Sequence, residues 1–306
     1  MLLALLAACA LDPEPTEGGN LCGTIDAPSG AAAMRSVWIG TVAEGHTACE
    51  SDTGGGWWGD TVEELETNLD TFEATVAPGS YAVEVDAGDY AGCAPAEVPD
   101  EAACAADVLV ELGYMVPVDK PNVYLYPEAP THIRVAIPAW KRITESEPRY
   151  PLGGWNVRAF PDGRLATKAG PRDFLFYELV YDVARFQTAE GWCVPGELAQ
   201  PTIEDAMADM GFLSNEIGDF AAAWDASFPK AEWITVYPQV DDLSALVVEP
   251  APTHLLRAWF LVADGCEDVV PPQLERVPRV GYHASEWGIA FRAPLDRGEI
   301  VVEGWR

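Results

Sequence analysis

Alternation of apolar and polar positions dominates the first third of the chain and predicts short β-strands. Within 72–76 and again within 81–85, apolar residues occupy every second position, as expected for a strand that buries one face. The intervening Ala77-Pro78-Gly79 supplies turn residues, so the two strands are expected to form a β-hairpin. Further strands are expected at 37–39 and 108–112.

The same period of two recurs in the second half of the chain. It predicts strands at 133–137, 155–159 and 173–178, with Pro161-Asp162-Gly163 as a turn. Later strands are expected at 234–237, 246–248, 255–262, 289–292 and 300–303.

A helical hairpin is expected to interrupt these strands at about 202–228. Thr202 is the expected N-cap, since Asp205 follows three residues later, and Gly211 is the expected stop. A second helix is expected to begin at Ser214 and to end before Pro229. The pattern as a whole predicts a β-rich α+β fold, in which a β-sandwich precedes a mixed β domain carrying the helical hairpin.

The charge of the chain is unevenly spread. The 306 residues carry a formal charge of −31, and residues 1–119 hold 22 acidic side chains against one basic side chain, Arg35. This change in composition predicts a boundary between an acidic β-sandwich at 21–118 and a second domain at 119–306. So acidic a protein repels phosphate, which argues against a nucleic-acid partner. A solvated acidic face that aids solubility is the favoured interpretation.

The first residues resemble a bacterial lipoprotein signal. An apolar run ends in Leu6-Ala7-Ala8-Cys9, which is similar to a lipobox and implies that Cys9 becomes lipid-modified at the end of a signal at 1–9. Residues 10–20 are rich in Pro, Gly and acidic residues and are expected to be a tether. Ala10 is not an acidic retention signal, so an exported protein on the outer membrane is expected, anchored to the membrane by lipid. No later segment is apolar for long enough to span a bilayer.

Six of the seven cysteines lie beyond Cys9, and an even number in an exported chain predicts disulfides. The short loop between Cys93 and Cys104 favours that pair, which leaves Cys22 with Cys49. The two cysteines of the second domain, Cys193 and Cys266, are then expected to pair with each other.

A glycine-rich acidic loop at 50–60 offers Asp52 and Asp60 as oxygen ligands for calcium. The acidic residues lack EF-hand spacing, so a plain loop is favoured, and calcium is the one cofactor that the sequence suggests. No CxxC pair occurs in the sequence, so a thiolate zinc site is not expected.

Two family resemblances add to this picture. Cys22-Gly23-Thr24-Ile25, followed by a strand, a Pro-Gly turn and a strand, resembles carboxypeptidase regulatory-like and Cna-B-type modules over 20–113. That resemblance implies a prealbumin-like or immunoglobulin-like sandwich, usually without catalysis.

Residues 120–290 resemble a group of uncharacterised bacterial envelope proteins whose opening motif reads approximately KPVIYLYP. The resemblance implies an envelope location and a fold, and no reaction. Ile289 departs from that group, since a second glycine usually follows Glu-Trp-Gly. The residues that carry the resemblance are Lys120, Pro121, Tyr124, Tyr126, Pro127, Trp155, Asp162, Gly163, Glu178 and Trp287.

The commonest catalytic motifs are absent from the sequence, including the nucleophile elbow, the P-loop and H-E-x-x-H. A non-catalytic binding or structural role is therefore expected, with an envelope protein or a glycan as ligand. The alternative is a carbohydrate hydrolase using carboxylates of the second domain, for which Glu178, Asp162 and Asp182 are the candidates. Two or more carboxylates that face each other in an aromatic-lined cleft, with pKa values pushed apart, would favour the hydrolase. A flat or filled second domain would favour the binding module.

Overall fold

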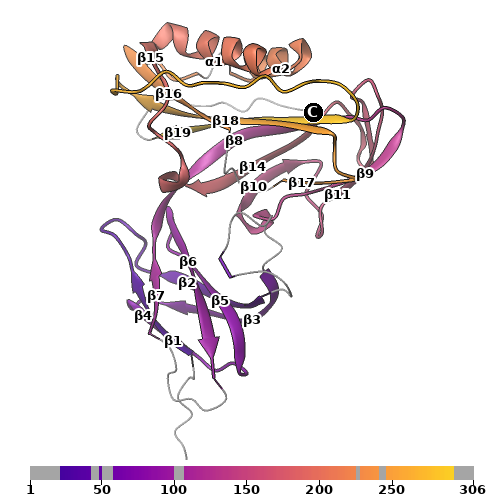
Figure 1. The fold of residues 1–306 in the computed structure, drawn as a ribbon. Helices are drawn as coiled ribbons and strands as arrows, with labels where there is room; N and C mark the ends of the chain where they lie inside the picture. The colour runs from indigo at the N-terminus through magenta and orange to yellow at the C-terminus, as the bar shows by residue number, and fades with distance from the viewer. Residues whose placement is uncertain are drawn as a thin grey trace, which may run out of the picture.

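The computed structural model describes residues 21–42, 48–49, 58–99, 107–224, 228–240 and 246–292. These residues form three sheets and two helices, so the predicted β-rich α+β fold with a helical insertion is confirmed. Figure 1 shows the amino-terminal strands below, and the second group of strands above them with both helices at the top.

The amino-terminal strands form a β-sandwich around one apolar core. One sheet has the order β4-β1-β7 and faces strands in the order β6-β5-β2-β3. Along β1 and β5 the inward side chains are fully or nearly fully buried, including Leu21, Ile25, Val83 and Val85. The strands are β1 (Leu21–Asp26), β2 (Arg35–Val42), β3 (Trp58–Thr67), β4 (Thr71–Ala74), β5 (Gly79–Asp86), β6 (Tyr90–Val98) and β7 (Asp107–Glu111).

The hairpin predicted at 72–85 is wrong, because its two strands lie in different sheets. β4 pairs with β1, whereas β5 pairs with β2 and β6. Phe72 and Tyr81 nevertheless pack in the same core. The predicted alternation of buried and exposed side chains is therefore correct, whereas the predicted pairing of the two strands is not. Two strands that face one core from opposite sides have the same alternation as two that lie side by side.

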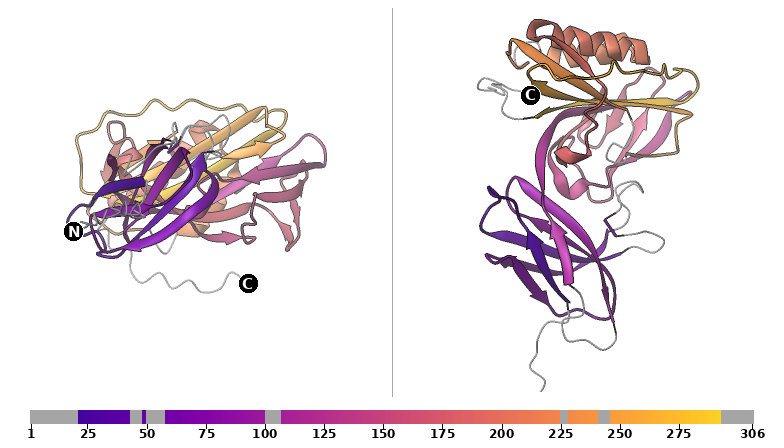
Figure 2. Two further views of the ribbon diagram at one scale, coloured as in Figure 1. Left: turned by 90° about the horizontal axis from the view of Figure 1, so that it is seen from below. Right: turned by 60° about the vertical axis from the view of Figure 1, so that its left-hand side comes forward.

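Strand β8 (Gly113–Tyr126) joins the two parts of the molecule. Tyr114 pairs with Tyr90 of β6 in the first part, and Met115 onward pairs with β14 and then β19 in the second. Figure 2 shows this strand passing from the lower sandwich into the upper domain. The predicted boundary at 118/119 therefore falls inside a continuous strand.

The second domain has three layers. A large sheet ordered β15-β16-β18-β19-β8-β14-β10 lies between a small sheet, ordered β13-β12-β11-β9-β17, and the two helices. Large-sheet strands other than β8 are β10 (Ile143–Glu147), β14 (Leu175–Asp182), β15 (Trp192–Pro195), β16 (Trp233–Gln239), β18 (His254–Asp264) and β19 (His283–Arg292). The small sheet contains β9 (Thr131–Ala136), β11 (Trp155–Ala159), β12 (Leu165–Thr167), β13 (Gly170–Arg172) and β17 (Val247–Glu249), and the helices are α1 (Gly196–Met210) and α2 (Ser214–Trp224).

Burial on both faces explains why β18 is almost continuously apolar. Trp259 and Leu261 pack towards the small sheet, whereas Phe260 and Val262 pack towards the helices. Successive side chains of a strand point to opposite faces, so a central strand between two cores needs an apolar residue at every position.

The helical hairpin is confirmed, but Thr202 is not its N-cap. Helix α1 begins at Gly196, and the Thr202 hydroxyl donates a hydrogen bond to the Leu198 carbonyl within the helix. Pro201 lies inside α1 on its exposed face. Proline has no N–H to donate, so the carbonyl one turn earlier loses its helical hydrogen bond, but water can solvate that carbonyl on the exposed face. Gly211 ends α1 with φ 103°, in the left-handed conformation that glycine adopts readily.

Two disulfides join described cysteines, Cys49 to Cys93 and Cys193 to Cys266. The second is the predicted pair. The predicted pairs Cys93–Cys104 and Cys22–Cys49 are wrong, because Cys49 and Cys93 bond to each other. Loop length is a weak guide, since halving a loop gains only about 0.6 kcal/mol, and strand placement decides the partner. Cys22 is also disulfide-bonded, and Cys104 lies outside the described residues.

Candidate functional site

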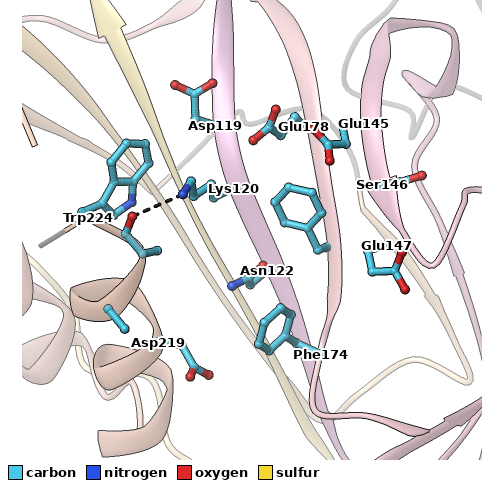
Figure 3. A pocket seen from close by; sticks show the side chains of 13 residues that line it. Asp119, Lys120, Asn122, Glu145, Ser146, Glu147, Phe174, Glu178, Asp219 and Trp224 are labelled. Carbon is cyan, nitrogen blue, oxygen red and sulfur yellow. Dashed lines mark hydrogen bonds between the residues drawn. The ribbon is translucent and has the colours of Figure 1, made fainter. Parts of the chain in front are cut away.

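The helices leave one end of the large sheet uncovered, and a pocket of about 410 Å³ lies there beside α2. Strands β8 and β14 supply its floor, while β10 and α2 flank it (Figure 3). Five carboxylates line the pocket with three aromatic rings, one lysine and one asparagine: Asp119, Glu145, Glu147, Glu178, Asp219, Phe174, Phe176, Trp224, Lys120 and Asn122.

A bulge in β8 places Asp119 and Lys120 at this pocket. Val118 and Val123 lie in the same core although five positions separate them, whereas a regular strand would put them on opposite faces. Lys120 has φ 56°, and the pairing of β8 shifts register on both sides of it. The bulge therefore accommodates the extra residue and re-aims the neighbouring side chains.

Glu178 lies among other carboxylates in the pocket. Its Cα pairs directly with that of Glu145 across β14 and β10, and Figure 3 shows Asp119, Glu145 and Glu178 at one end of the pocket. Burial, together with the negative charges of Asp119 and Glu145, raises the pKa of Glu178 from 4.5 to about 7. Lys120 opposes this rise through its charge and a backbone hydrogen bond to the carboxylate.

The ammonium of Lys120 is already engaged by α2. Its Nζ donates to the carbonyl of Ala223 at 3.2 Å and lies 5.0 Å from the centroid of the Trp224 ring. Both contacts lie in the last turn of the helix, where carbonyl groups favour a cation. Glu147 is paired with Arg172, so the net negative charge of the pocket comes mainly from Asp119, Glu145, Glu178 and Asp219.

The other end of the pocket contains a second polar group of residues. The Tyr124 hydroxyl donates to Asp219 Oδ2 at 3.0 Å. Burial raises the pKa of Asp219, and the charge of Asp173 adds to the effect. Asn122 is 4% exposed, and its Oδ1 has no hydrogen-bond partner among the described residues. A buried unpaired acceptor is costly, and this one belongs to a residue that lines the pocket.

Of the three predicted carboxylates, only Glu178 lies in the pocket. Asp162 is in an exposed turn, where its bond to Arg164 lowers its pKa. Asp182 accepts a hydrogen bond from the Ala184 amide at 2.9 Å and caps a short 3₁₀-helix at Val183–Arg185. The structure does not bring these two carboxylates together with Glu178.

Apart from Lys120 and Glu178, which line the pocket, the residues that carry the envelope-protein resemblance mostly serve packing. Gly163 has φ 87°, and a Cβ there would lie 2.7 Å from the ring of Tyr126. Trp155 donates to the Pro148 carbonyl at 2.8 Å, and Trp287 packs edge-on against Phe220. Pro121 and Pro127 are also buried.

Sequence reasoning missed four of the five carboxylates, namely Asp119, Glu145, Glu147 and Asp219. A usable signal was present in Ile143–Glu147, where acidic side chains alternate along a strand that pairs with the predicted strand containing Glu178. The sequence does not indicate that pairing, and Asp219 comes from a helix remote in sequence.

The predicted calcium ligands are not gathered into a site. Asp60 lies on β3, with its backbone amide donating to the Thr41 hydroxyl, and Asp52 lies outside the described residues, as does Cys9. Within the described ranges, no group of three His, Cys, Asp or Glu side chains is placed to hold a metal ion. Neither described helix is long and apolar enough to cross a membrane.

The chain matches no known family model, no curated protein and no solved structure. The resemblances to bacterial envelope proteins and to sandwich modules therefore stay predictions. The case for the function of this protein accordingly depends on the geometry of the pocket beside α2.

Proposed function

We propose that the protein is a binding protein whose pocket beside α2 takes a ligand with a cationic group next to an apolar surface. The observation that carries this proposal is the gathering of Asp119, Glu145 and Glu178 at one end of a partly buried pocket. Lys120, the one lysine among the described residues that line the pocket, contacts Ala223 and Trp224. Carboxylates in such a setting repel one another, and a bound cation relieves that repulsion.

The aromatic side chains suit the apolar part of such a ligand. Phe176 and Glu178 lie two positions apart on β14, Phe174 directly precedes that strand, and all three line the pocket. Aromatic faces attract cations in addition to burying apolar surface. An alkyl ammonium, as in a lysine side chain, fits both features, and an amino sugar is the corresponding glycan ligand.

The test uses a matched pair of probes that differ only in charge. Nα-acetyl-lysine amide, which keeps its side-chain ammonium, is expected to bind at least about tenfold more tightly in calorimetry than Nα-acetyl-norleucine amide. This ratio corresponds to about 1.4 kcal/mol of binding free energy. Binding should strengthen as pH rises from 6 to 8, because Glu178 ionises through a pKa of about 7. Equal affinity for the two probes, or binding that weakens over this pH range, would falsify the proposal.

A hydrolase acting on carbohydrate is the second candidate, and the pKa of Glu178 favours it. A carboxyl with a pKa of about 7 is half protonated at neutral pH and can serve as a general acid. The neighbouring carboxylates would stabilise the positive charge that develops on a sugar during glycoside cleavage. The gathering of Asp119, Glu145 and Glu178 in a pocket with aromatic rings supports this candidate.

The two candidates differ in their dependence on pH. A general acid must be protonated, so hydrolysis of oligosaccharides should decline above pH 7 and be lost in Glu178→Gln. Cation binding should instead increase with pH. Oligomers of glucosamine and of N-acetylglucosamine are suitable substrates, because they compare a cationic with a neutral sugar on one backbone. Release of a shorter sugar by the wild type and not by the variant would favour the hydrolase.

We also propose that the protein is exported and held at the outer membrane by lipid on Cys9, where a glycan or another envelope protein would be its ligand. The disulfides Cys49–Cys93 and Cys193–Cys266 support an oxidising compartment. A pocket that faces solvent at the edge of α2 is accessible to such a ligand.

A further inference from the structure

The outer face of the small sheet is basic in an otherwise acidic protein. Its outward side chains line an open groove of about 560 Å³. His132, Arg134, Arg158 and Lys168 contribute to this groove, and Glu249 is the one carboxylate among the described residues that line it. The chain has 18 basic residues against 49 acidic ones, so three Arg or Lys side chains around one groove depart from the general charge pattern.

The register of the strands brings these side chains close together. His132 of β9 lies directly opposite Arg158 of β11, and Arg134 lies opposite Asn156. Arg134 and Arg158 are therefore diagonal neighbours on the outer face, at positions whose Cβ atoms lie about 7–8 Å apart. An anion bound between them can contact both guanidinium groups.

The cationic groups differ in how they are held. Arg134 is fixed, since its Nε donates to the Gly153 carbonyl and its Nη1 to Glu249 Oε2, both at 2.9 Å. Arg158 stacks over the ring of Phe160, with 5.7 Å between the guanidinium carbon and the ring centroid. Within the described part of the chain, Arg158 and Lys168 form no ion pair. The groove therefore keeps an uncompensated positive charge.

We propose that this groove binds an anionic polysaccharide. Its two guanidinium groups come from diagonal positions on β9 and β11, with Cβ atoms about 7–8 Å apart. That spacing suits a polymer with roughly one charge per sugar better than duplex DNA, with one charge per ~1.7 Å. Among the described residues, the exposed lining has no Phe, Tyr or Trp side chain, and Ala166 and Pro250 are its apolar members. Protein interfaces depend on buried aromatic anchors, whereas Asn156 and the cationic groups suit hydroxyl and acid groups of a glycan.

The groove is separate from the pocket beside α2. The inner face of the small sheet packs against the large sheet through Ile133, Val135 and Val157, so its outer face points away from the helices. The pocket opens on the opposite, helix-bearing face of the large sheet. A substitution that abolishes binding in the groove should therefore leave binding in the pocket measurable, and the reverse also holds.

The test compares binding of the full soluble chain to polymers that differ in charge. Dextran sulfate and polygalacturonate are expected to bind, whereas neutral dextran is not, and the comparison identifies sulfate or carboxylate as the better ligand. The double variant Arg158→Gln with Lys168→Gln should weaken binding at least tenfold. The slope of log Kd against log salt should fall by about 2, by analogy with phosphate contacts.

The matched control is Arg149→Gln with Arg185→Gln, which removes the same charge from exposed sites outside the groove. This control, and Glu178→Gln in the pocket, should bind the anionic polymers as the wild type does. Equal weakening in the control would indicate non-specific attraction and overturn the proposal. So would absence of binding to both anionic polymers, or tighter binding of polyglutamate or of an oligonucleotide. Thermal melting of each variant checks that it is folded.

Discussion

Replacing Glu178 with glutamine removes a titrating carboxyl while keeping the size of the side chain. In the folded protein this carboxyl has a pKa raised from 4.5 to about 7, mainly by burial and then by Asp119 and Glu145. The folded state therefore binds a proton more tightly than the unfolded state, and wild-type stability falls as pH rises from about 4.5 to about 7. Above that window the ionised carboxylate has its full destabilising effect.

The size of the effect follows from the same shift in pKa. A rise from 4.5 to about 7 corresponds to at most about 3.4 kcal/mol at 25 °C. Glu178 is only partly buried, so solvent screening reduces the expected value to about 1–1.5 kcal/mol. We therefore expect Glu178→Gln to unfold at higher urea concentration than the wild type at pH 8.5 and at nearly the same concentration at pH 4.5.

Urea denaturation followed by tryptophan fluorescence at both pH values measures this difference. The control is Glu128→Gln, which changes an exposed glutamate just after β8 and gives the background effect of losing a surface charge. The reasoning is refuted if Glu178→Gln is no more stable than the wild type at pH 8.5. It is equally refuted if the gain is the same at both pH values.

Three further outcomes are expected. Tyr177→Phe should lower stability by about 1.5–3 kcal/mol in urea, since it removes the hydroxyl that donates to the fully buried Glu286 at 2.5 Å. Replacing Cys193 and Cys266 with serine opens a cross-link between cysteines 73 positions apart and should cost about 4 kcal/mol, read from the denaturation midpoint of the oxidised wild type against the variant. Cys9→Ser should move the protein from the membrane to the soluble fraction of expressing cells; unchanged fractionation argues against a lipid anchor.

The sequence predicted most elements of the fold because a strand or helix with one buried face has apolar residues at regular intervals. Strand β11 has its predicted bounds, 155–159, and Gly211 ends α1 because its left-handed conformation suits glycine. The failures have a common cause, which is that local patterns do not identify partners. The hairpin at 72–85 and the pairing of Cys93 both depended on which strands become neighbours.

The candidate site was less predictable because it combines distant segments. Glu178 was expected to matter, but Glu145 reaches it only through strand pairing, and Asp219 only through the packing of α2. The bulge at Lys120 depends on a positive φ in a residue other than glycine, which is uncommon. Pairing on both sides of β8 holds the bulge in place, and no local signal reports that pairing.

The net charge of the chain does not describe the local charge of each face of the second domain. The formal charge of −31 would repel a polyanion only if charges across the whole surface acted on it. At physiological salt, charges farther than about 8 Å from the ligand are largely screened. The neighbours of a ligand at Arg158 are His132 and Arg134, which lie within that distance on adjacent positions of the small sheet. The acidic sandwich therefore does not decide the specificity of the groove, and the acidic pocket beside α2 is equally insulated from the basic groove. One domain thus presents opposite charges on its two faces, and the two proposals assign a cation to one face and a polyanion to the other.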